Sequence, residues 1–139
     1  MNAEYLYKEE TDTIIAAFYE VYHVLGFGFL EKVYENALCQ ELESRGMKCV
    51  QQQKLQVYYK GQVVGDYLAD VVVNDCIILE LKAVDELSPA NEYQLINYLR
   101  ATGLQVGLLL NFGRRPQVKR KVNIKNSLRS SASSASSAF

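Results

Sequence analysis

Long hydrophobic runs are missing from this sequence of 139 residues. No apolar stretch approaches the roughly 18 residues that a membrane-spanning helix requires. The first ten residues carry Glu4, Lys8, Glu9 and Glu10, without the apolar segment behind a basic flank that marks a secretion signal. We therefore expect a soluble, cytoplasmic protein with no membrane partner.

Cysteine and histidine are scarce. The three cysteines, Cys39, Cys49 and Cys76, are an odd number without a CxxC pair, and His23 is the single histidine. So few cysteines and histidines argue against a disulfide framework and against a zinc site. We expect the cysteines to be reduced and packed. His23 stands near the end of a predicted helix, where a lone histidine is more often a cap than a catalyst.

Acidic residues are absent from the last part of the chain. Residues 1–113 contain all 16 acidic and eight of the 15 basic residues, a net charge of −8, whereas residues 114–139 contain seven basic residues, a net charge of +7. A basic surface could attract nucleic acid to an otherwise acidic body, and a solvated basic tail is the simpler alternative. The candidate nucleic-acid-binding residues are Arg114, Arg115, Lys119, Arg120 and Lys121.

The order of hydrophobic patterns predicts one α/β domain over residues 1–125. Residues 126–139 are mostly Ser and Ala, cannot bury enough surface to order themselves, and are assigned no function. The predicted helices cover residues 4–25, 29–45 and 88–100, and the predicted strands cover 49–59, 63–73, 76–84 and 104–110. The strand, helix and strand between residues 76 and 110 should form a right-handed crossover.

Two local patterns refine this organisation. Ser88 and Pro89 supply a helix N-cap followed by a proline at the first helical position. In the helix over residues 29–45, the apolar spacing predicts that Leu30 and Val33 face the core and that Glu35 faces solvent.

Two charges, Glu80 and Lys82, interrupt a hydrophobic strand. Residues i and i+2 of a strand point to the same face, and burying such charges is costly unless they are paired or bind a metal. Asp70 adds a carboxylate from the preceding strand. These residue types suit phosphodiester hydrolysis, in which carboxylates hold Mg²⁺ and a lysine positions the nucleophile or stabilises the transition state. The alternative is a cross-strand salt bridge on an exposed face.

A shared metal site constrains the register of the hairpin that carries these residues. Asp70 and Glu80 must leave the same face of the hairpin, and directly opposed residues of an antiparallel pair do share a face. A two-residue turn would direct Glu80 to the other face. We therefore predict a three-residue loop over 74–76, or a bulge of the same parity, that sets Val73 opposite Ile77.

Seven separated blocks have a recognisable order along residues 5–122. They are GFLEKVY at 28–34, ENAL at 35–38, YYKG at 58–61, LAD at 68–70, ELKA at 80–83, QLINYL at 94–99 and GLLLNFG at 107–113. Together these blocks resemble the GxxExxY proteins, a branch of the PD-(D/E)XK nuclease superfamily. The resemblance is specific because all seven agree, although Ala69 stands where the superfamily name has proline.

The resemblance implies a restriction-endonuclease-like core of αβββαβ order, with a mixed sheet of four to five strands and an extra N-terminal helix. It implies that Asp70 and Glu80 bind Mg²⁺ or Mn²⁺, that Lys82 is the active-site lysine and that Gln94 supports them. Glu31 matches the glutamate of the family motif, and in related nucleases such a residue can join the metal site. A carboxylate in the first turn of a helix is also favoured by the helix dipole alone.

These observations predict a metal-dependent nuclease acting on DNA or RNA, with DNA favoured. The alternatives are a nucleic-acid-binding or protein-binding module that keeps the fold without turnover, and an interaction subunit of a larger assembly. The set of Asp70, Glu80 and Lys82 favours the enzyme, because a binding module has no reason to bear the desolvation cost of two converging carboxylates. A homodimer would help so small a domain to span a duplex.

Overall fold

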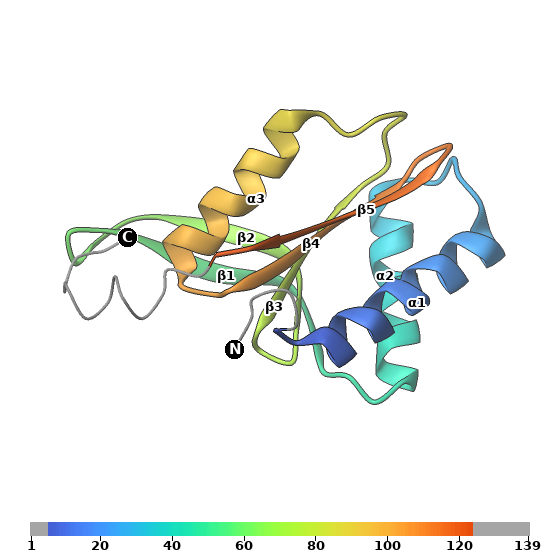
Figure 1. The fold of residues 1–139 in the computed structure, drawn as a ribbon, viewed down its shortest axis with the longest axis horizontal. Helices are drawn as coiled ribbons and strands as arrows, with labels where there is room; N and C mark the ends of the chain where they lie inside the picture. Colours follow the sequence, from blue (N-terminus) through green and yellow to red (C-terminus); the bar gives the residue numbers. More distant parts are fainter. Residues whose placement is uncertain (1–5, 124–139) are drawn as a thin grey trace.

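The computed structural model describes residues 6–123, which form three helices and a five-stranded mixed sheet (Figure 1). The predicted α/β class is therefore confirmed, whereas the predicted boundary at residue 125 and the tail over 126–139 lie outside the described residues. No helix within the described range has the length and apolar character needed to span a membrane. The elements are α1 (Lys8–Leu25), α2 (Glu31–Ser44), β1 (Cys49–Tyr59), β2 (Gln62–Val73), β3 (Ile77–Lys82), α3 (Pro89–Thr102), β4 (Val106–Phe112) and β5 (Pro116–Val122).

The sheet lies between two layers of helix (Figure 1). Its strand order is β1-β2-β3-β4-β5, and β3 and β4 are the parallel pair, joined through α3. On one face, Phe18 of α1 and Leu38 of α2 share a core cluster with Leu79 of β3. On the other face, Leu95 of α3 shares a second cluster with Ile78. Alternate residues of β3 therefore belong to different cores, which explains why the strand is apolar on both faces.

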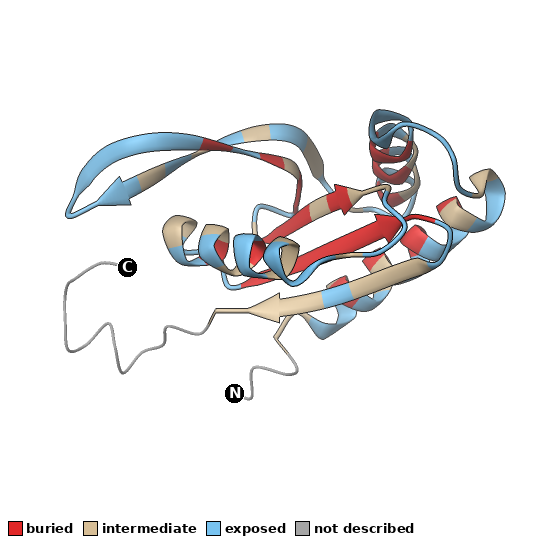
Figure 2. Ribbon diagram, turned by 90° about the horizontal axis from the view of Figure 1, so that it is seen from above, coloured by how far each residue is buried: buried red, intermediate tan, exposed pale blue. Residues whose placement is uncertain are grey.

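The two ends of the sheet differ in how far helices cover them. Every residue of β4 is buried, as expected for a strand with helices on both faces. The β1–β2 hairpin instead extends past α3, and its far half is largely exposed (Figure 2). The sheet is thus compact around β3 and β4 and open toward the hairpin.

The start of α3 follows the predicted pattern. Ser88 is the N-cap, Asn91 completes a reciprocal capping box with it, and Pro89 occupies the first turn. The helix ends at Gly103, which has a φ of 81°. Left-handed backbone of this kind favours glycine. Local sequence is sufficient to set both ends of this helix.

The predicted orientation of α2 is wrong in part. Leu30 and Val33 have 80% and 39% of their surface exposed, whereas Glu35 has only 5% exposed. The helix begins at Glu31, so Leu30 is its N-cap and lies outside the packed stripe. Glu35 can be buried because side chains from β1 and α2 form hydrogen bonds with its carboxylate. The spacing of apolar residues in the sequence cannot reveal such partners.

The strand β5 was not predicted, because its sequence is rich in lysine and arginine. It pairs antiparallel with β4 from Phe112 opposite Pro116 to Val106 opposite Val122. Val118 and Val122 pack against the core cluster of α1 and α2. Two apolar residues on the same face of β5 are therefore enough to hold it against the core while it pairs with the edge of β4.

The three cysteines are free, as expected. Cys39 is buried, and its thiol is hydrogen-bonded to that of Cys49. The hydrogen bond with Cys49, and then burial, raise the pKa of Cys39. These residues act in packing within the described part of the chain.

A close approach between two backbones gives a test of the fold. A Cβ atom at Gly113 would lie 1.8 Å from the carbonyl oxygen of Val84, whereas at Gly65 it would meet nothing within 4 Å. We expect Gly113→Ala to lower the free energy of unfolding by about 1 to 3 kcal/mol through overpacking. Gly65→Ala should be neutral or stabilise by about 0.5 kcal/mol, because alanine restricts the unfolded chain. Urea unfolding followed by circular dichroism measures both, and equal stability of the two variants would contradict the close contact.

Candidate active site

The loop between α1 and α2 is held by one buried tyrosine. The hydroxyl of Tyr34 donates to the carbonyl oxygen of Gly26 at 2.6 Å and accepts from the backbone N–H of Phe29 at 3.2 Å. Gly28 has a φ of 112°, a conformation that L side chains rarely adopt. Glu31 then begins α2. In the GxxExxY segment, the glycine allows the turn, the tyrosine fixes it, and the glutamate is placed at the helix start.

Glu31 links the start of α2 to the end of β3. Its carboxylate accepts a hydrogen bond from the backbone N–H of Ala83. Burial raises the pKa of Glu31, the positive charge of Lys82 lowers it, and the carboxylates of Asp70 and Glu35 raise it further. Glu31 therefore lies in the electrostatic environment of the predicted site residues.

The register of the β2–β3 hairpin is the one that a shared site requires. Val73 pairs with Ile77 across the loop of residues 74–76, and Val71 pairs with Leu79. The predicted three-residue loop is thus confirmed. The backbone ladder between these strands ends at Val71 and Leu79, one pair before the predicted carboxylates.

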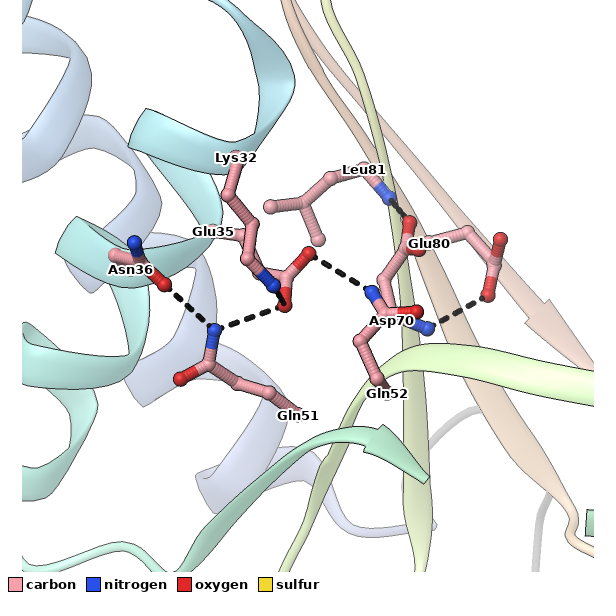
Figure 3. Close-up of polar contacts among 8 residues, drawn as sticks. All are labelled: Lys32, Glu35, Asn36, Gln51, Gln52, Asp70, Glu80 and Leu81. Atoms are coloured by element: carbon pink, nitrogen blue, oxygen red, sulfur yellow. Dashed lines mark hydrogen bonds and ion pairs between the residues drawn. The ribbon is translucent and has the colours of Figure 1, made fainter. Parts of the chain in front are cut away.

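Side chains replace the ladder where β2 and β3 diverge. The backbone N–H of Leu81 donates to Asp70 Oδ2 at 2.8 Å, and the backbone N–H of Asp70 donates to Glu80 Oε2 at 3.3 Å (Figure 3). The segments that carry Asp70 and Glu80 are therefore joined by bonds from backbone to side chain beyond the end of the ladder. We call this divergence of the two strands the fork.

A buried carboxylate of α2 organises β1 beside the fork. Glu35 Oε2 accepts from Lys32 Nζ at 3.0 Å and from Gln51 Nε2 at 2.8 Å, and Glu35 Oε1 accepts from Gln52 Nε2 at 3.0 Å (Figure 3). Three donors compensate the burial of this charge. Glu35 thereby ties α2 to the strand that neighbours Asp70.

The β1–β2 pairing is irregular at Gln52 and Asp70. Neighbouring pairs on both sides are regular, but Gln52 has a φ of 52°. Val71 belongs to the core under α1 and α2, whereas Ala69 and Tyr67 belong to the core under α3. Strand alternation alone cannot place residues 69 and 71 on opposite faces, so β2 changes face at Asp70.

Glu80 lies on the α3 side of the sheet. The hydroxyl of Tyr67 donates to Glu80 Oε2, and the ring of Tyr67 stacks on Tyr98 with centroids 3.5 Å apart. Gln94, one turn before Tyr98, is hydrogen-bonded to the Tyr98 hydroxyl. Gln94 is thus connected to Glu80 through two tyrosines, and its side chain is exposed.

Burial disfavours the charged forms of the two central carboxylates. Burial, and then the charge of Asp70, raise the pKa of Glu80 to about 7, while the hydrogen bond from Tyr67 and the charge of Lys82 lower it. Burial also raises the pKa of Asp70, against the lowering effects of the Leu81 N–H, the Gln52 side chain and Lys82. Lys82 is the one cation that lowers the pKa of Asp70, Glu80 and Glu31 alike. The site therefore has an excess of negative charge that a further cation would relieve.

The donor set fits a hard divalent cation. Carboxylate oxygens are the ligands that Mg²⁺ takes from proteins, commonly one or two together with water. Within residues 6–123, no group of three His, Cys, Asp or Glu side chains is arranged to hold an ion. Asp70 and Glu80 are consequently the candidate pair, and Glu31 is the nearest candidate for a third.

The structure divides the candidate nucleic-acid-binding residues. Arg120 donates to the carbonyl oxygen of Leu6 at 2.6 Å, and Lys121 forms an ion pair with Glu92 of α3 at 2.6 Å. Adjacent residues of β5 point to opposite faces, so these two cations cannot share one surface with each other. Arg114 and Arg115 lie in the exposed turn between β4 and β5. The candidate cations therefore lie on different parts of the surface, and their role in binding nucleic acid stays a prediction.

Three residues of the site were not predicted. Glu35 was assigned to the solvent face, and Gln52 and Tyr67 were not assigned. The polar run Gln51-Gln52-Gln53 in an otherwise strand-like segment was the available signal for a break in β1. Tyr67 carried no comparable signal, because a tyrosine on a strand is ordinary.

The comparison with known families agrees with this geometry. A family model described as the PD-(D/E)XK nuclease superfamily matches residues 8–122, from the first residue of α1 to the last of β5. The protein belongs to the PD-(D/E)XK nuclease superfamily. No curated protein sequence matches the chain significantly.

A solved structure supports the fold. The crystal structure of SSO0001 is similar to this chain with a TM-score of 0.52 and 18% sequence identity, over 84% of this chain and 59% of that chain. This chain thus corresponds to less than two thirds of that protein. Together with the family match, the likeness confirms the predicted restriction-endonuclease-like α/β fold.

The raised pKa of Glu80 gives a prediction about stability. The folded chain has a pKa of about 7 at Glu80 against an ordinary value of 4.5, so between these values it binds more protons than the unfolded chain. The unfolding free energy therefore falls as the pH rises through this window. We expect Glu80→Gln to gain about 1 to 3 kcal/mol relative to the wild type between pH 5 and pH 8.

Denaturant unfolding at both pH values, with a chelator present, measures this difference. Glu20→Gln on the exposed side of α1 is the matched control and should give the same difference from wild type at both pH values. A constant difference for Glu80→Gln as well would show that its carboxyl group is not destabilised by burial.

Proposed function

We propose that this protein is a metal-dependent nuclease of the GxxExxY branch that hydrolyses phosphodiester bonds of DNA or RNA. The observation that carries the proposal is the fork, where Asp70 and Glu80 are joined, Lys82 acts on both carboxylates, and Glu31 reaches the backbone of Ala83. Membership of the superfamily supports phosphodiester hydrolysis as the reaction, and the fork contains residue types that suit this reaction.

Asp70 and Glu80 would hold Mg²⁺ or Mn²⁺, with Glu31 as the nearest additional carboxylate. A divalent cation in such a site lowers the pKa of a bound water and offsets negative charge on the phosphate. The protein contributes a partly buried setting in which the backbone N–H of Asp70 holds the carboxylate of Glu80 beside the residue that carries the second carboxylate. Burial, and then the charge of Asp70, raise the pKa of Glu80 to about 7. A bound cation would relieve the repulsion between the two carboxylates, and it would compete with a proton for Glu80.

Lys82 is proposed to act on the phosphate. The charge of its ammonium group lowers the pKa of Glu31, Asp70 and Glu80, so the group lies near any phosphate that approaches these carboxylates. An ammonium group next to a phosphoryl oxygen stabilises the charge that develops in the transition state.

Tyr67 and Gln94 have supporting roles in the proposal. Tyr67 orients Glu80 by donating to its carboxylate, and Gln94 holds Tyr98 against the Tyr67 ring. Outer partners of this kind commonly affect metal affinity by one to two orders of magnitude. Gln94 would thus act on the site through the tyrosines, as well as on the nucleic acid from its exposed position.

The rival function is a binding module that keeps the fold without turnover. It is favoured by one observation, that the described residues contain no preformed three-residue metal cluster. Metal binding separates the two functions before any substrate is known, because the rival has no use for an ion at the fork.

We expect Asp70→Ala and Glu80→Ala to lose both metal binding and cleavage. Lys82→Ala should bind Mn²⁺ with nearly wild-type affinity and lose cleavage, because an ammonium group is no metal ligand. Titration calorimetry measures the first property, and cleavage of labelled single-stranded and duplex DNA and RNA measures the second. Full turnover by Lys82→Ala would refute its role, and wild-type protein that binds no Mn²⁺ would favour the binding module.

The two glutamines bonded to Glu35 form a matched pair. Both donate to its carboxylate, but the Gln52 side chain also lies close enough to Asp70 to lower the pKa of that carboxyl group. We expect Gln52→Ala to weaken Mn²⁺ binding by about tenfold, as outer partners of metal ligands do. Gln51→Ala should stay within about twofold of the wild type, since its side chain has no such effect on a proposed ligand. Equal effects of the two substitutions in calorimetry would assign them a general role in anchoring α2.

A further inference from the structure

Three loops meet at the end of the sheet where β3 and β4 terminate (Figure 1). The Tyr22 hydroxyl at the end of α1 lies 2.7 Å from the carbonyl oxygens of both Gly113 and Arg114 in the β4–β5 turn. The Arg114 guanidinium lies over the ring of Phe27 in the α1–α2 loop, 5.1 Å from its centroid. Its Nε is also 3.6 Å from Asp85 in the loop after β3.

This meeting point adjoins the proposed active site. Asp85 is three residues beyond Lys82 along the chain, and the backbone at Gly113 packs directly on Val84. From the other side, Glu31 is four residues beyond Phe27 and reaches Ala83. The aromatic and guanidinium groups are therefore carried by the same segments that place the carboxylates and the lysine.

The aromatic side chains of the α1–α2 loop are exposed on a fixed backbone. Phe27 is 53% exposed and Phe29 is 46% exposed. The backbone of their loop is held by the buried Tyr34 hydroxyl, which bonds to it at Gly26 and Phe29. A solvent-facing ring on a backbone fixed in this way is preorganised for stacking.

The charges around these rings indicate the class of ligand. Arg114 and Arg115 are exposed, and the Lys32 side chain is more than half exposed. The body of the protein is otherwise acidic, so a nucleic acid needs local cations of this kind to approach. A protein partner or a second copy of the chain would use the apolar rings without requiring the guanidinium groups beside them.

We propose that Phe27 and Arg114 form a stacking clamp for unpaired bases, so that the substrate is single-stranded nucleic acid. The inference rests on the proposed nuclease function, which it extends by naming the substrate class. An exposed ring can stack on a base that is unpaired, whereas the bases of a duplex are already stacked on each other. Arg114 adds a planar cation that can stack or meet a phosphate.

The chain contains a matched control for this clamp. At the far end of the β1–β2 hairpin, Lys60 Nζ lies 5.4 Å from the ring centroid of Tyr59, which is 60% exposed. This pair has an exposed aromatic ring and a cation but no contact with the loops at the site. Substitution of Tyr59 therefore tests whether any exposed aromatic ring would have the same effect.

The experiment measures binding separately from cleavage. Fluorescence anisotropy with a labelled 20-nucleotide DNA, the RNA of the same sequence and the DNA duplex is performed on variants that also carry Glu80→Gln. We expect Phe27→Leu to weaken single-strand binding by about 5- to 50-fold, as loss of one base stack does, and duplex binding by less than about twofold. Phe27→Trp should retain single-strand binding, and Tyr59→Leu should match the parent protein. Comparison of the DNA and RNA strands shows which sugar the site prefers.

Three results would overturn the clamp. The first is unchanged single-strand binding by Phe27→Leu, and the second is an equal loss of duplex binding by this variant. The third is a concentration-dependent dimer of the parent protein in sedimentation that Phe27→Leu loses, which would assign the surface to a second copy of the chain. The proposed function is tested independently by cleavage with the wild-type protein and Mn²⁺. If the wild type cleaves and Phe27→Leu binds single strands normally, the nuclease proposal stands and the clamp is refuted. If Phe27→Leu selectively loses single-strand binding but the wild type does not cleave, the clamp stands and the nuclease proposal is refuted.

Discussion

The divergence of β2 from β3 is the constraint on which the rest of the structure depends. Where the two strands separate, their backbone groups lose partners, and a buried N–H without a partner is costly. The carboxylates of Asp70 and Glu80 supply these partners by accepting from Leu81 and from Asp70 itself. The acidic residues thus complete the hydrogen bonding of the sheet, which keeps them at the fork before any ligand arrives.

The three carboxylates at and beside the fork are stabilised to very different extents. Glu35 accepts from three side-chain donors and anchors α2 to β1. Asp70 and Glu80 have raised pKa values because burial outweighs the bonds and the single lysine near them. Carboxylates whose charged forms are disfavoured in this way lower the free energy of unfolding, and a ligand that binds only the folded chain raises it by mass action. The charge of Glu35 is therefore compensated by its donors, whereas the charges of Asp70 and Glu80 are compensated only in part.

Sequence patterns predicted the features that short-range rules determine. The N-cap at Ser88 was predicted correctly from the local sequence. The hairpin register was also correct, because the two-residue strand period allows Asp70 and Glu80 to share a face only with a loop of this parity. The burial of Glu35 was missed, since its partners come from a strand that only the fold brings near. β5 was missed because its charges obscured the alternation of Val118 and Val122, and its position depends on the edge of β4.

The kink at Gln52 also has a consequence for how molecules of this protein meet one another. β1 is an edge strand, and a long straight edge with unpaired backbone groups invites pairing with the edge of another chain. The left-handed backbone at Gln52 interrupts the 11-residue strand near its start. Irregularities of this kind turn an edge away from a potential partner. The left-handed backbone at Gln52 thereby shortens the surface available for edge-to-edge aggregation. Because the Gln52 side chain also donates to Glu35, replacing this irregularity with regular strand would lower solubility and disturb the contacts beside the fork.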